Sequence, residues 1–199
     1  MIRPDYKKIT QVLNYMAERE GGKINYMKAL KLLYLADRLH LRKYGRLITD
    51  DRLVAMKKGT LGSQAKDIIL KNDNLPYIVY KYSEDKLKRD LAKYTIESNF
   101  KSKDNLSETD IECVDKVISV LGKKKEFDLA KLTHDLPEWK RHEYVIEKGE
   151  KLVEDLDPLD LFEPTNNHEL NKIYSQPDEE LILSKDLFLE YLDQEKSLA

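Results

Sequence analysis

The amino-acid sequence predicts a mainly α-helical fold with a small antiparallel β-sheet of two or three strands, in a single globular domain followed by a C-terminal extension. Residues 6–19, 26–44 and 108–121 carry apolar side chains three and four positions apart, which is the spacing of one helix face. Shorter segments at 52–57 and 77–82 are rich in residues that favour strands. No strand-like segment leads into a glycine-rich phosphate-binding loop, so a doubly wound sheet is not expected.

The composition limits the class of protein. The chain has 199 residues, of which 41% are hydrophobic and 36% are charged, and this suffices for the core of one domain. The single cysteine, Cys113, excludes an intramolecular disulfide and a cysteine-rich zinc site. Because the sequence has no run of 18 apolar residues and begins with no apolar leader, we expect a soluble cytoplasmic protein without membrane contact.

The formal net charge of −2 conceals two oppositely charged halves. Residues 1–103 contain 23 Lys and Arg against 12 Asp and Glu and sum to +11, whereas residues 104–199 contain 12 against 25 and sum to −13. We favour the interpretation that the two halves neutralise each other within one folded body. The alternative is that one half is an exposed surface for a partner of opposite charge.

Local signals set the ends of the first two helices. Gly21-Gly22 ends the first helix, and Asn25 is a suitable N-cap for the second. Gly45 follows the second helix, where a left-handed residue is preferred. The apolar stripe of the second helix leaves these polar residues largely outside the predicted core: Lys28, Lys31, Asp37, Arg38, Arg42 and Lys43.

The strand candidates lie between residues 52 and 97. Residues 52–57 are a short strand, residues 59–62 a turn, and Ser63 an N-cap for a helix that ends near Lys71. The segment 77–82 is predicted to be a strand, with 91–97 as its partner across a charged turn.

The C-terminal half begins with a capping-box-like pair, Ser107 and Asp110, at the start of the helix over 108–121. Gly122 ends this helix. Further helical segments are expected at 127–132 and at 137–148, where Pro137 is acceptable in the first turn.

The last fifty residues are acidic. Residues 155–167 contain two prolines and predict an extended arm or linker. Residues 181–183 fit a short strand or a helical turn, and Ser184 is a candidate N-cap for the final helix.

Asp37, His40 and His134 are the candidates for polar chemistry. Asp37 and His40 stand three positions apart on one helix face, and together with His134 they offer a metal site or an acid–base pair. We favour a hydrogen-bonded junction in which the imidazole and carboxylate satisfy one another. Trp139 is expected to fill a pocket and Cys113 to be inert. We therefore predict no catalytic residue, no metal site and no cofactor, in a protein that is not an enzyme.

Aromatic and basic residues alternate at Tyr77, Tyr80, Lys81 and Tyr82. Such a pattern can stack nucleic-acid bases on a sheet. We favour a half-buried amphipathic strand, because no RNA-binding sequence motif accompanies it.

Three ordered segments resemble the core of the Panacea domain, the SocA-like antitoxin family that includes phage-associated proteins of the GepA type: LKLLYLADRLHLRKYGR at 30–46, ITDD at 48–51 and VAMKKG at 54–59. The family pattern is a helix of the form K-L-x-Y-x-A-D-x-x-H-x-x-x-Y-G followed by a strand of the form V-A-M-x-x-G-P-V. We assign these residues to the first motif: Tyr34, Asp37, Arg38, His40, Tyr44, Gly45, Val54, Ala55, Lys57 and Gly59.

A second resemblance follows in the expected order. The segment LSETDI at 106–111, then Thr133-His134 and Trp139, is similar to the Ser-initiated helix and Thr/Ser-His…Trp element of the family. Together the motifs cover about residues 6–148, so we assign the Panacea-like domain to 1–149 and an acidic extension to 150–199, packed on the domain or on a partner. The chain departs from the family at 60–62, where TLG replaces Pro-Val and removes the fixed φ of proline.

The resemblance implies an antitoxin that binds and neutralises a cognate protein toxin, either by blockade or by delivering it to a protease. Neither mechanism requires a catalytic centre in this chain. The alternative is a nucleic-acid-binding regulator, or a phage accessory or anti-defence protein, that uses the basic N-terminal half. A metal-dependent hydrolase built on Asp37, His40 and His134 is a third class.

Candidate contacts with a partner come from both halves. The basic cluster near the end of the second helix contains Arg38, Arg42, Lys43 and Arg46, and its simpler role is to complement the helix dipole. The acidic extension has three interpretations: it packs on the basic half, mimics nucleic acid, or steers a basic toxin surface. In the last, these apolar residues are anchors: Leu161, Phe162, Leu187, Phe188 and Tyr191.

Overall fold

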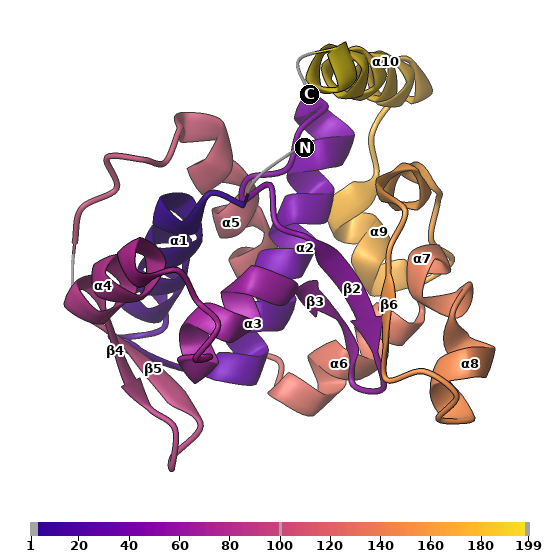
Figure 1. Cartoon of the computed structure of the whole chain (residues 1–199). Helices are drawn as coiled ribbons and strands as arrows, with labels where there is room; N and C mark the ends of the chain where they lie inside the picture. The colour runs from indigo at the N-terminus through magenta and orange to yellow at the C-terminus, as the bar shows by residue number, and fades with distance from the viewer. Residues whose placement is uncertain (1–3, 100, 198–199) are drawn as a thin grey trace.

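The computed structural model describes residues 4–99 and 101–197, which form helices around two small sheets (Figure 1). The helices are α1 (Tyr6–Arg19), α2 (Tyr26–Tyr44), α3 (Ser63–Leu70), α4 (Tyr77–Lys86), α5 (Glu108–Leu121), α6 (Glu126–His134), α7 (Pro137–Lys140), α8 (Glu143–Glu147), the 3-10 helix η1 (Pro158–Phe162), α9 (His168–Tyr174) and α10 (Asp178–Ser197). The strands are β1 (Lys23–Asn25), β2 (Leu53–Met56), β3 (Gly59–Gly62), β4 (Leu87–Asp90), β5 (Thr95–Ser98) and β6 (Val153–Asp155). The mainly α class is confirmed, with two three-stranded antiparallel sheets in place of one.

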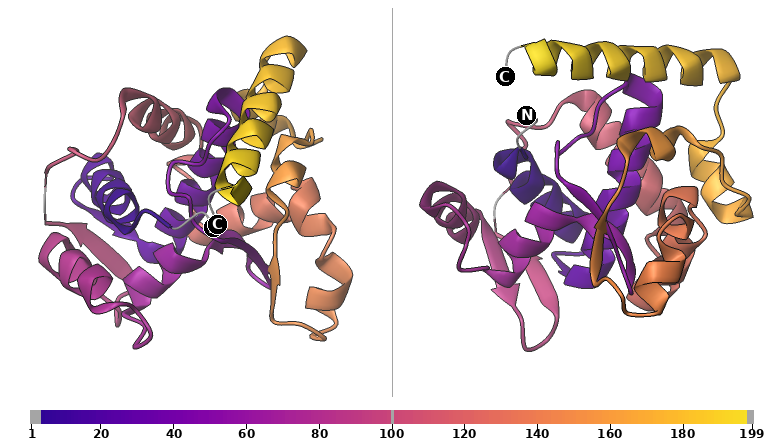
Figure 2. Two further views of the ribbon diagram at one scale, coloured as in Figure 1. Left: turned by 45° about the horizontal axis from the view of Figure 1, so that its top comes forward. Right: turned by 45° about the vertical axis from the view of Figure 1, so that its right-hand side comes forward.

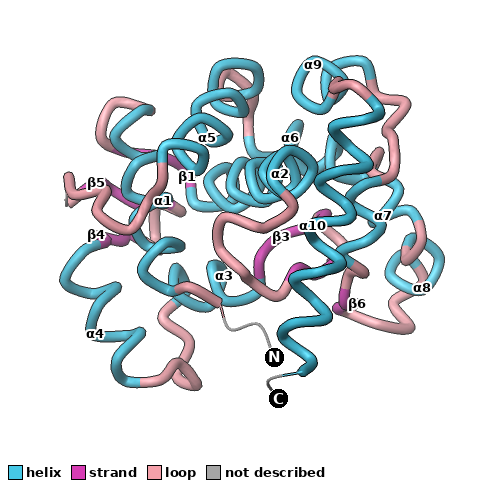
Figure 3. Tube along the Cα trace, turned by 90° about the horizontal axis from the view of Figure 1, so that it is seen from above, coloured by secondary structure: helices cyan, strands magenta, loops and turns pink. Residues whose placement is uncertain are grey.

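Helix α2 is the central element of the fold. In Figure 3 it is seen almost end-on with other helices on several sides, and it contacts α1, α5, α6, α10 and β3. The side chain of Asn25 accepts a hydrogen bond from the backbone N–H of Lys28, and Gly45 ends the helix at φ 67°, so both predicted caps are confirmed. Because elements cover α2 all round, residues 29–42 are all buried, including polar residues that a single apolar stripe places outside the core.

The first sheet has the order β1-β5-β4. Its hairpin pairs 87–90 with 95–98, so the predicted second strand is present near 95–98 but has a different partner. The prediction of a strand at 77–82 is wrong, because this segment belongs to helix α4, which begins after Pro76. Val79 and Ser83, four positions apart, are buried, whereas Tyr77 and Ile78 are exposed. Packing on α1 selects the helical period over strand propensity in this short apolar run.

The second sheet has the order β3-β2-β6 and joins a hairpin of the N-terminal half to a strand of the C-terminal half. Strand β2 confirms the strand predicted at 52–57, but residues 59–62, predicted to be a turn, form its partner β3. The prediction of an extended arm at 155–167 is also wrong, since β6 pairs with β2 and Pro158 begins η1. Strand pairing satisfies the backbone groups of these short segments, a long-range effect that local turn signals do not report.

Three further boundaries differ from the prediction. The helix expected over 137–148 is divided into α7 and α8, with a turn at 141–142. Ser63 is the first residue of α3 rather than its cap, and the side chain of Asp51 accepts the N–H bonds of Gln64 and Ala65. Ser184 lies inside α10, where its hydroxyl donates to the carbonyl oxygen of Arg42 at 2.6 Å. The helices at 6–19, 26–44 and 108–121 have the predicted bounds, and the capping box of Ser107 and Asp110 is formed.

The acidic C-terminal segment packs on the rest of the molecule. Helix α10 crosses the end of α2 as a separate rod, visible in both views of Figure 2, and buries Phe188 there. Ion pairs join the basic and acidic halves, for example Lys8 with Asp110 at 2.9 Å. Others are Arg19 with Asp115, Lys43 with Glu112, and Arg52 with Asp155. These contacts support the interpretation that the halves neutralise each other.

Candidate functional site

Asp37 fastens α2 to the loop that follows it. Its carboxylate accepts hydrogen bonds from the N–H groups of Ile48 and Thr49, at 2.7 and 3.0 Å, and from the Thr49 hydroxyl at 2.7 Å. Burial raises the pKa of Asp37 to about 7, against these three donors, which favour the ionised form. Asp37 therefore positions the 46–51 loop.

His40 has partners of its own, which differ from those of Asp37. Its Nδ1 lies 2.9 Å from the carbonyl oxygen of Arg46, and its Nε2 lies 3.0 Å from the Thr109 hydroxyl. Burial lowers the pKa of His40 to about 4, so the ring is neutral at pH 7 and its 3.2 Å approach to Asp110 is not an ion pair. The expectation that Asp37 and His40 satisfy one another is wrong; each is bonded to other groups.

His134 and Trp139 form a separate pair. Their rings stack at 3.9 Å between centroids, and the indole N–H donates to the carbonyl oxygen of Met56 at 3.0 Å. Burial, and then the nearby charge of Lys31, lower the pKa of His134. Among the residues that the structure describes, no group of three or more His, Cys, Asp or Glu side chains could hold a metal ion.

The structure also places Cys113 and the tyrosines of the segment 77–82. Cys113 is fully buried and burial raises the pKa of its thiol to about 12. In α4, Tyr77 and Tyr80 are exposed, and Tyr82 accepts a hydrogen bond from Gln11 at 3.2 Å. Because the segment is helical, both the favoured interpretation, a half-buried amphipathic strand, and the alternative of a base-stacking sheet surface are wrong.

A buried cluster surrounds Glu138, a residue that the sequence analysis missed. One oxygen of Glu138 accepts hydrogen bonds from the Tyr34 hydroxyl at 2.6 Å and from Nε of Arg38 at 2.9 Å. The guanidinium of Arg38 lies over the ring of Tyr174, 4.4 Å from its centroid. Burial, together with the charge of Glu138, raises the pKa of Tyr34. The one signal in the sequence that could have pointed to Glu138 is its position immediately before the Trp of the second motif.

The guanidinium groups of Arg38 and Arg42 hold the acidic extension by its main chain. Arg38 donates to the carbonyl oxygen of Glu163 at 2.7 Å, and Arg42 donates to those of Leu161, Phe162 and Glu163. We call this set of contacts the arginine clamp. It connects the first motif to residues outside the predicted domain.

The expected partner contacts are largely used inside the chain. Arg38, Arg42, Phe162 and Phe188 are buried, and Tyr191 is partly buried against the core, so these side chains do not form an open docking surface. Lys43 pairs with Glu112, which also accepts from the Tyr44 hydroxyl at 2.7 Å, and Arg46 pairs with Asp110 at 3.1 Å. The basic cluster on α2 is therefore not the free face that nucleic-acid binding requires.

The two motifs meet at the β2–β3 turn. Val54 and Ala55 are buried in β2, and Gly59 has φ +87° at the turn. A Cβ atom at Gly59 would lie 2.0 Å from the Thr133 hydroxyl oxygen and 3.2 Å from Nζ of Lys31. Only glycine tolerates both this positive φ and the close approach of the Thr133 hydroxyl group. The close packing of Gly59 against Thr133 brings α6, β3 and α2 together.

Lys31 is a second residue that the sequence analysis missed as a candidate. Its side chain is almost completely buried, and its ammonium group donates to the carbonyl oxygen of Thr60 at 2.6 Å. Burial lowers the pKa of Lys31 to about 7. The sequence carried no clear signal for its burial, because Lys31 lies outside the apolar stripe of the second helix. A lysine whose pKa is strongly lowered by burial, at the wall of a surface groove, is a candidate functional residue.

Lys31 contributes to the wall of a surface groove of about 410 Å³ between α2, the β2–β3 turn and α3. We call it the lysine groove. Its lysines are Lys31, Lys57, Lys58 and Lys66, and its other lining residues are Tyr26, Met27, Leu30, Met56, Gly59, Leu61 and Leu152. None of the salt bridges among the described residues involves these four lysines. The groove therefore combines an apolar floor with uncompensated positive charge.

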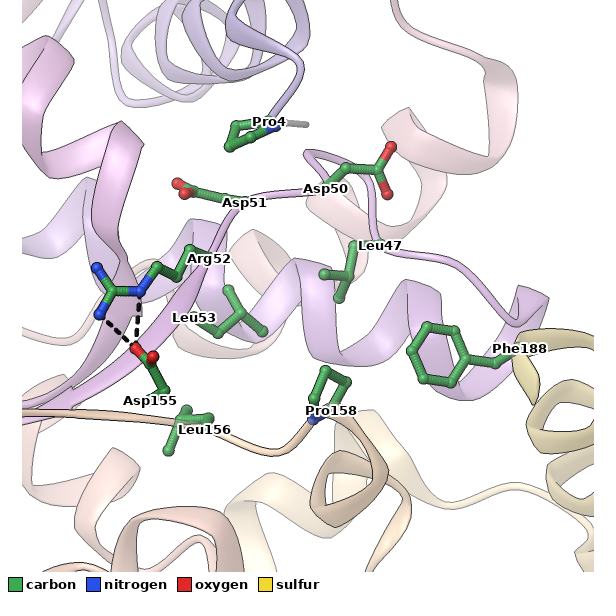
Figure 4. A pocket seen from close by; sticks show the side chains of 10 residues that line it. All are labelled: Pro4, Leu47, Asp50, Asp51, Arg52, Leu53, Asp155, Leu156, Pro158 and Phe188. Carbon is green, nitrogen blue, oxygen red and sulfur yellow. Dashed lines mark hydrogen bonds and ion pairs between the residues drawn. The ribbon is translucent and has the colours of Figure 1, made fainter. Parts of the chain in front are cut away.

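A second cavity, of about 280 Å³, lies at the seam between the N-terminal part and the acidic extension (Figure 4). Three of its polar side chains have partners within the chain: Arg52 donates to Asp155 at 2.7 Å, and Asp51 caps α3. Figure 4 shows Leu53 and Leu156 on the same lining. The cavity thus belongs to the packing of the extension.

Comparison with known proteins gives one match. The family described as "Antitoxin SocA-like, Panacea domain" matches residues 30–140. No curated protein and no solved structure shows a significant match. No helix among the described residues is long and apolar enough to cross a membrane. The matched range includes α2 from residue 30 onward, both strands of the β2–β3 hairpin, and Tyr34, Arg38 and Glu138. The chain belongs to the SocA-like antitoxin family with a Panacea domain.

Proposed function

We propose that this protein is an antitoxin that neutralises a cognate, growth-inhibiting protein toxin by direct binding, with no bond made or broken by its own side chains. Membership of the SocA-like antitoxin family over residues 30–140 carries the proposal. The structure adds support, because the polar residues of the motif hold the fold together. Asp37 fixes a loop, His40 joins two helices, and Arg38 holds the extension.

The test is co-expression with the protein encoded next to the gene. We expect the neighbour to stop growth when expressed alone and to be harmless when this chain is expressed at an equal or greater level. Neutralisation by blockade is stoichiometric, so in that case growth should recover only as the ratio approaches one, whereas an adaptor can act below it. A neighbour that is harmless alone would contradict the proposal.

The same cultures separate blockade from delivery to a protease. Blockade leaves the amount of full-length toxin unchanged and yields a complex that purifies as one species. An adaptor instead shortens the lifetime of the toxin after synthesis is stopped. Immunoblots of the toxin over time distinguish these two forms of the proposed function.

A further inference from the structure

The lysine groove has the properties of a binding surface. Its volume, about 410 Å³, lies within the usual range of ligand sites, and apolar side chains such as Met27, Leu30 and Leu61 line it. Leu152 at its rim is 79% exposed. Leu152 extends the apolar lining of the groove to the surface, where an apolar side chain of a partner can pack.

The charge of the groove is of one sign. Lys57 and Lys58 are exposed at the β2–β3 turn, and Lys66 approaches from α3. Nζ of Lys66 lies 4.0 Å from the thioether sulfur of Met56. The groove therefore presents several separate cations, and opposite charges on a partner would find no competitor among its lining residues.

Lys31 adds a buried amine to the exposed lysines of the groove. A buried ammonium group is costly when a single neutral carbonyl oxygen is its partner, and an arriving carboxylate would offset that cost. Gly59 and Thr133 lie against the same region, so the position of Lys31 is fixed by close packing rather than by a flexible surface.

We propose that the lysine groove receives an acidic and partly apolar segment of the toxin, whose carboxylates contact Lys31 and the rim lysines Lys57, Lys58 and Lys66. This inference rests on the proposed function and identifies the surface and chemistry of its partner. A protein segment suits the groove because cations spread over a turn and a helix, together with an exposed leucine, match several carboxylates and an apolar side chain.

The first experiment reverses the charge of the rim in a variant with K57E, K58E and K66E. Its control makes the same change in net charge at three exposed lysines outside the groove: K7E, K101E and K123E. Because like charges across an interface cost several kcal/mol, we expect the Kd for the co-expressed toxin to rise at least about a hundredfold in the rim variant. The control should stay within about threefold of the wild type.

These results separate the two proposals. A wild-type chain that neutralises the toxin, with a rim variant that binds as tightly as the control, would overturn the groove and leave the antitoxin function intact. A wild-type chain that neither binds nor neutralises the neighbouring protein would remove both.

Lys31→Met tests the buried amine of the groove wall without changing the charge of the exposed rim lysines. We expect this variant to keep the circular dichroism spectrum of the wild type and to bind the toxin at least about tenfold more weakly, because a charge-assisted contact is lost. An unchanged Kd for Lys31→Met would overturn the role of Lys31.

Carbodiimide cross-linking locates the contact directly, because it couples an amine to a carboxylate that touches it. Mass spectrometry of the wild-type complex should show Lys57, Lys58 or Lys66 joined to aspartate or glutamate of the toxin. Cross-links from toxin lysines only to Asp186 or Glu190 on α10 would instead place the partner there and overturn the proposal. Groove lysines joined only to a second copy of this chain would overturn it in favour of self-association.

Discussion

Lys31 shows what burial does to a single charged residue in this fold. Its pKa falls from 10.5 to about 7, so between about pH 7 and pH 10 the unfolded chain binds a proton that the folded chain does not. Stability rises with pH wherever the unfolded state binds more protons. The Lys31 contribution therefore improves through this window, and below pH 7 the cost of the buried charge is fully present.

Replacing Lys31 by methionine removes that cost. At pH 6.5 we expect the free energy of unfolding of Lys31→Met to exceed that of the wild type by about 1–3 kcal/mol, since the lost charge penalty outweighs the lost bond to Thr60. The advantage should shrink towards pH 9.5. Urea titrations at both pH values measure it, with the exposed Lys7→Met as control. If the difference in the free energy of unfolding between Lys31→Met and the wild type did not depend on pH, the lowered pKa of Lys31 would be contradicted.

Sequence reasoning identified the residue types at this scale but not their surroundings. Lys31, Asp37, Arg38 and Arg42 lie outside the apolar stripe of α2, and a helix with one buried face would leave them at the surface. The helix is covered on several sides, so all four are buried. Periodicity reports the most apolar face of a helix and does not reveal that the other faces are also covered.

At the scale of elements, α10 is positioned by one glycine at the end of α2. A Cβ atom at Gly45 would lie 2.7 Å from the carbonyl oxygen of Ser184 and 2.9 Å from Cβ of Leu187. The hydroxyl of Ser184 and the amide of Gln176 also reach the carbonyl oxygen of Arg42. The αL cap of α2 and the docking of α10 thus depend on the same position.

Gly45→Ala should therefore loosen α10. We expect a loss of about 1–3 kcal/mol from the positive φ and the clash, and faster hydrogen exchange of the amides over 184–192. Gly149→Ala is a matched control, because its φ is +72° but nothing lies within 4 Å of the added Cβ. Equal exchange rates over α10 in the two variants would contradict the coupling.

Element ends were predictable where a local signal set them. Asn25, Gly45 and the Ser107–Asp110 box each act within a few residues, and the helices that they flank have the predicted bounds. The helix α4 and the strands β3 and β6 were missed, because packing on α1 and pairing with β2 decide them. Such long-range contacts override short-range propensity.

At the scale of the whole molecule, the boundary between 1–149 and 150–199 crosses a continuous core. Strand β6 completes a sheet with β2, and Leu161, Phe162 and Leu170 are buried in the same cluster as α2. The arginine clamp joins the two parts through buried guanidinium groups. The extension is therefore expected to be part of the folding unit.

A chain cut after residue 149 should fail to fold cooperatively, because Arg38 and Arg42 would lose their carbonyl partners and the α2 face would be exposed. A chain cut after residue 177 removes only α10; it should still unfold cooperatively, at lower denaturant than the full chain. Circular dichroism during urea unfolding compares the two. A soluble 1–149 fragment with a sharp transition would show that the domain ends where the sequence motifs end.

The arginine clamp has a consequence for how residues 161–163 tolerate change. Every amino acid offers the same carbonyl oxygen, so the two arginines are indifferent to which side chain stands at an exposed position such as Glu163. They are sensitive to spacing instead. Deleting one residue between the prolines at 158 and 164 would offset all three oxygens by a step, whereas a substitution at 163 would go unnoticed by the arginines.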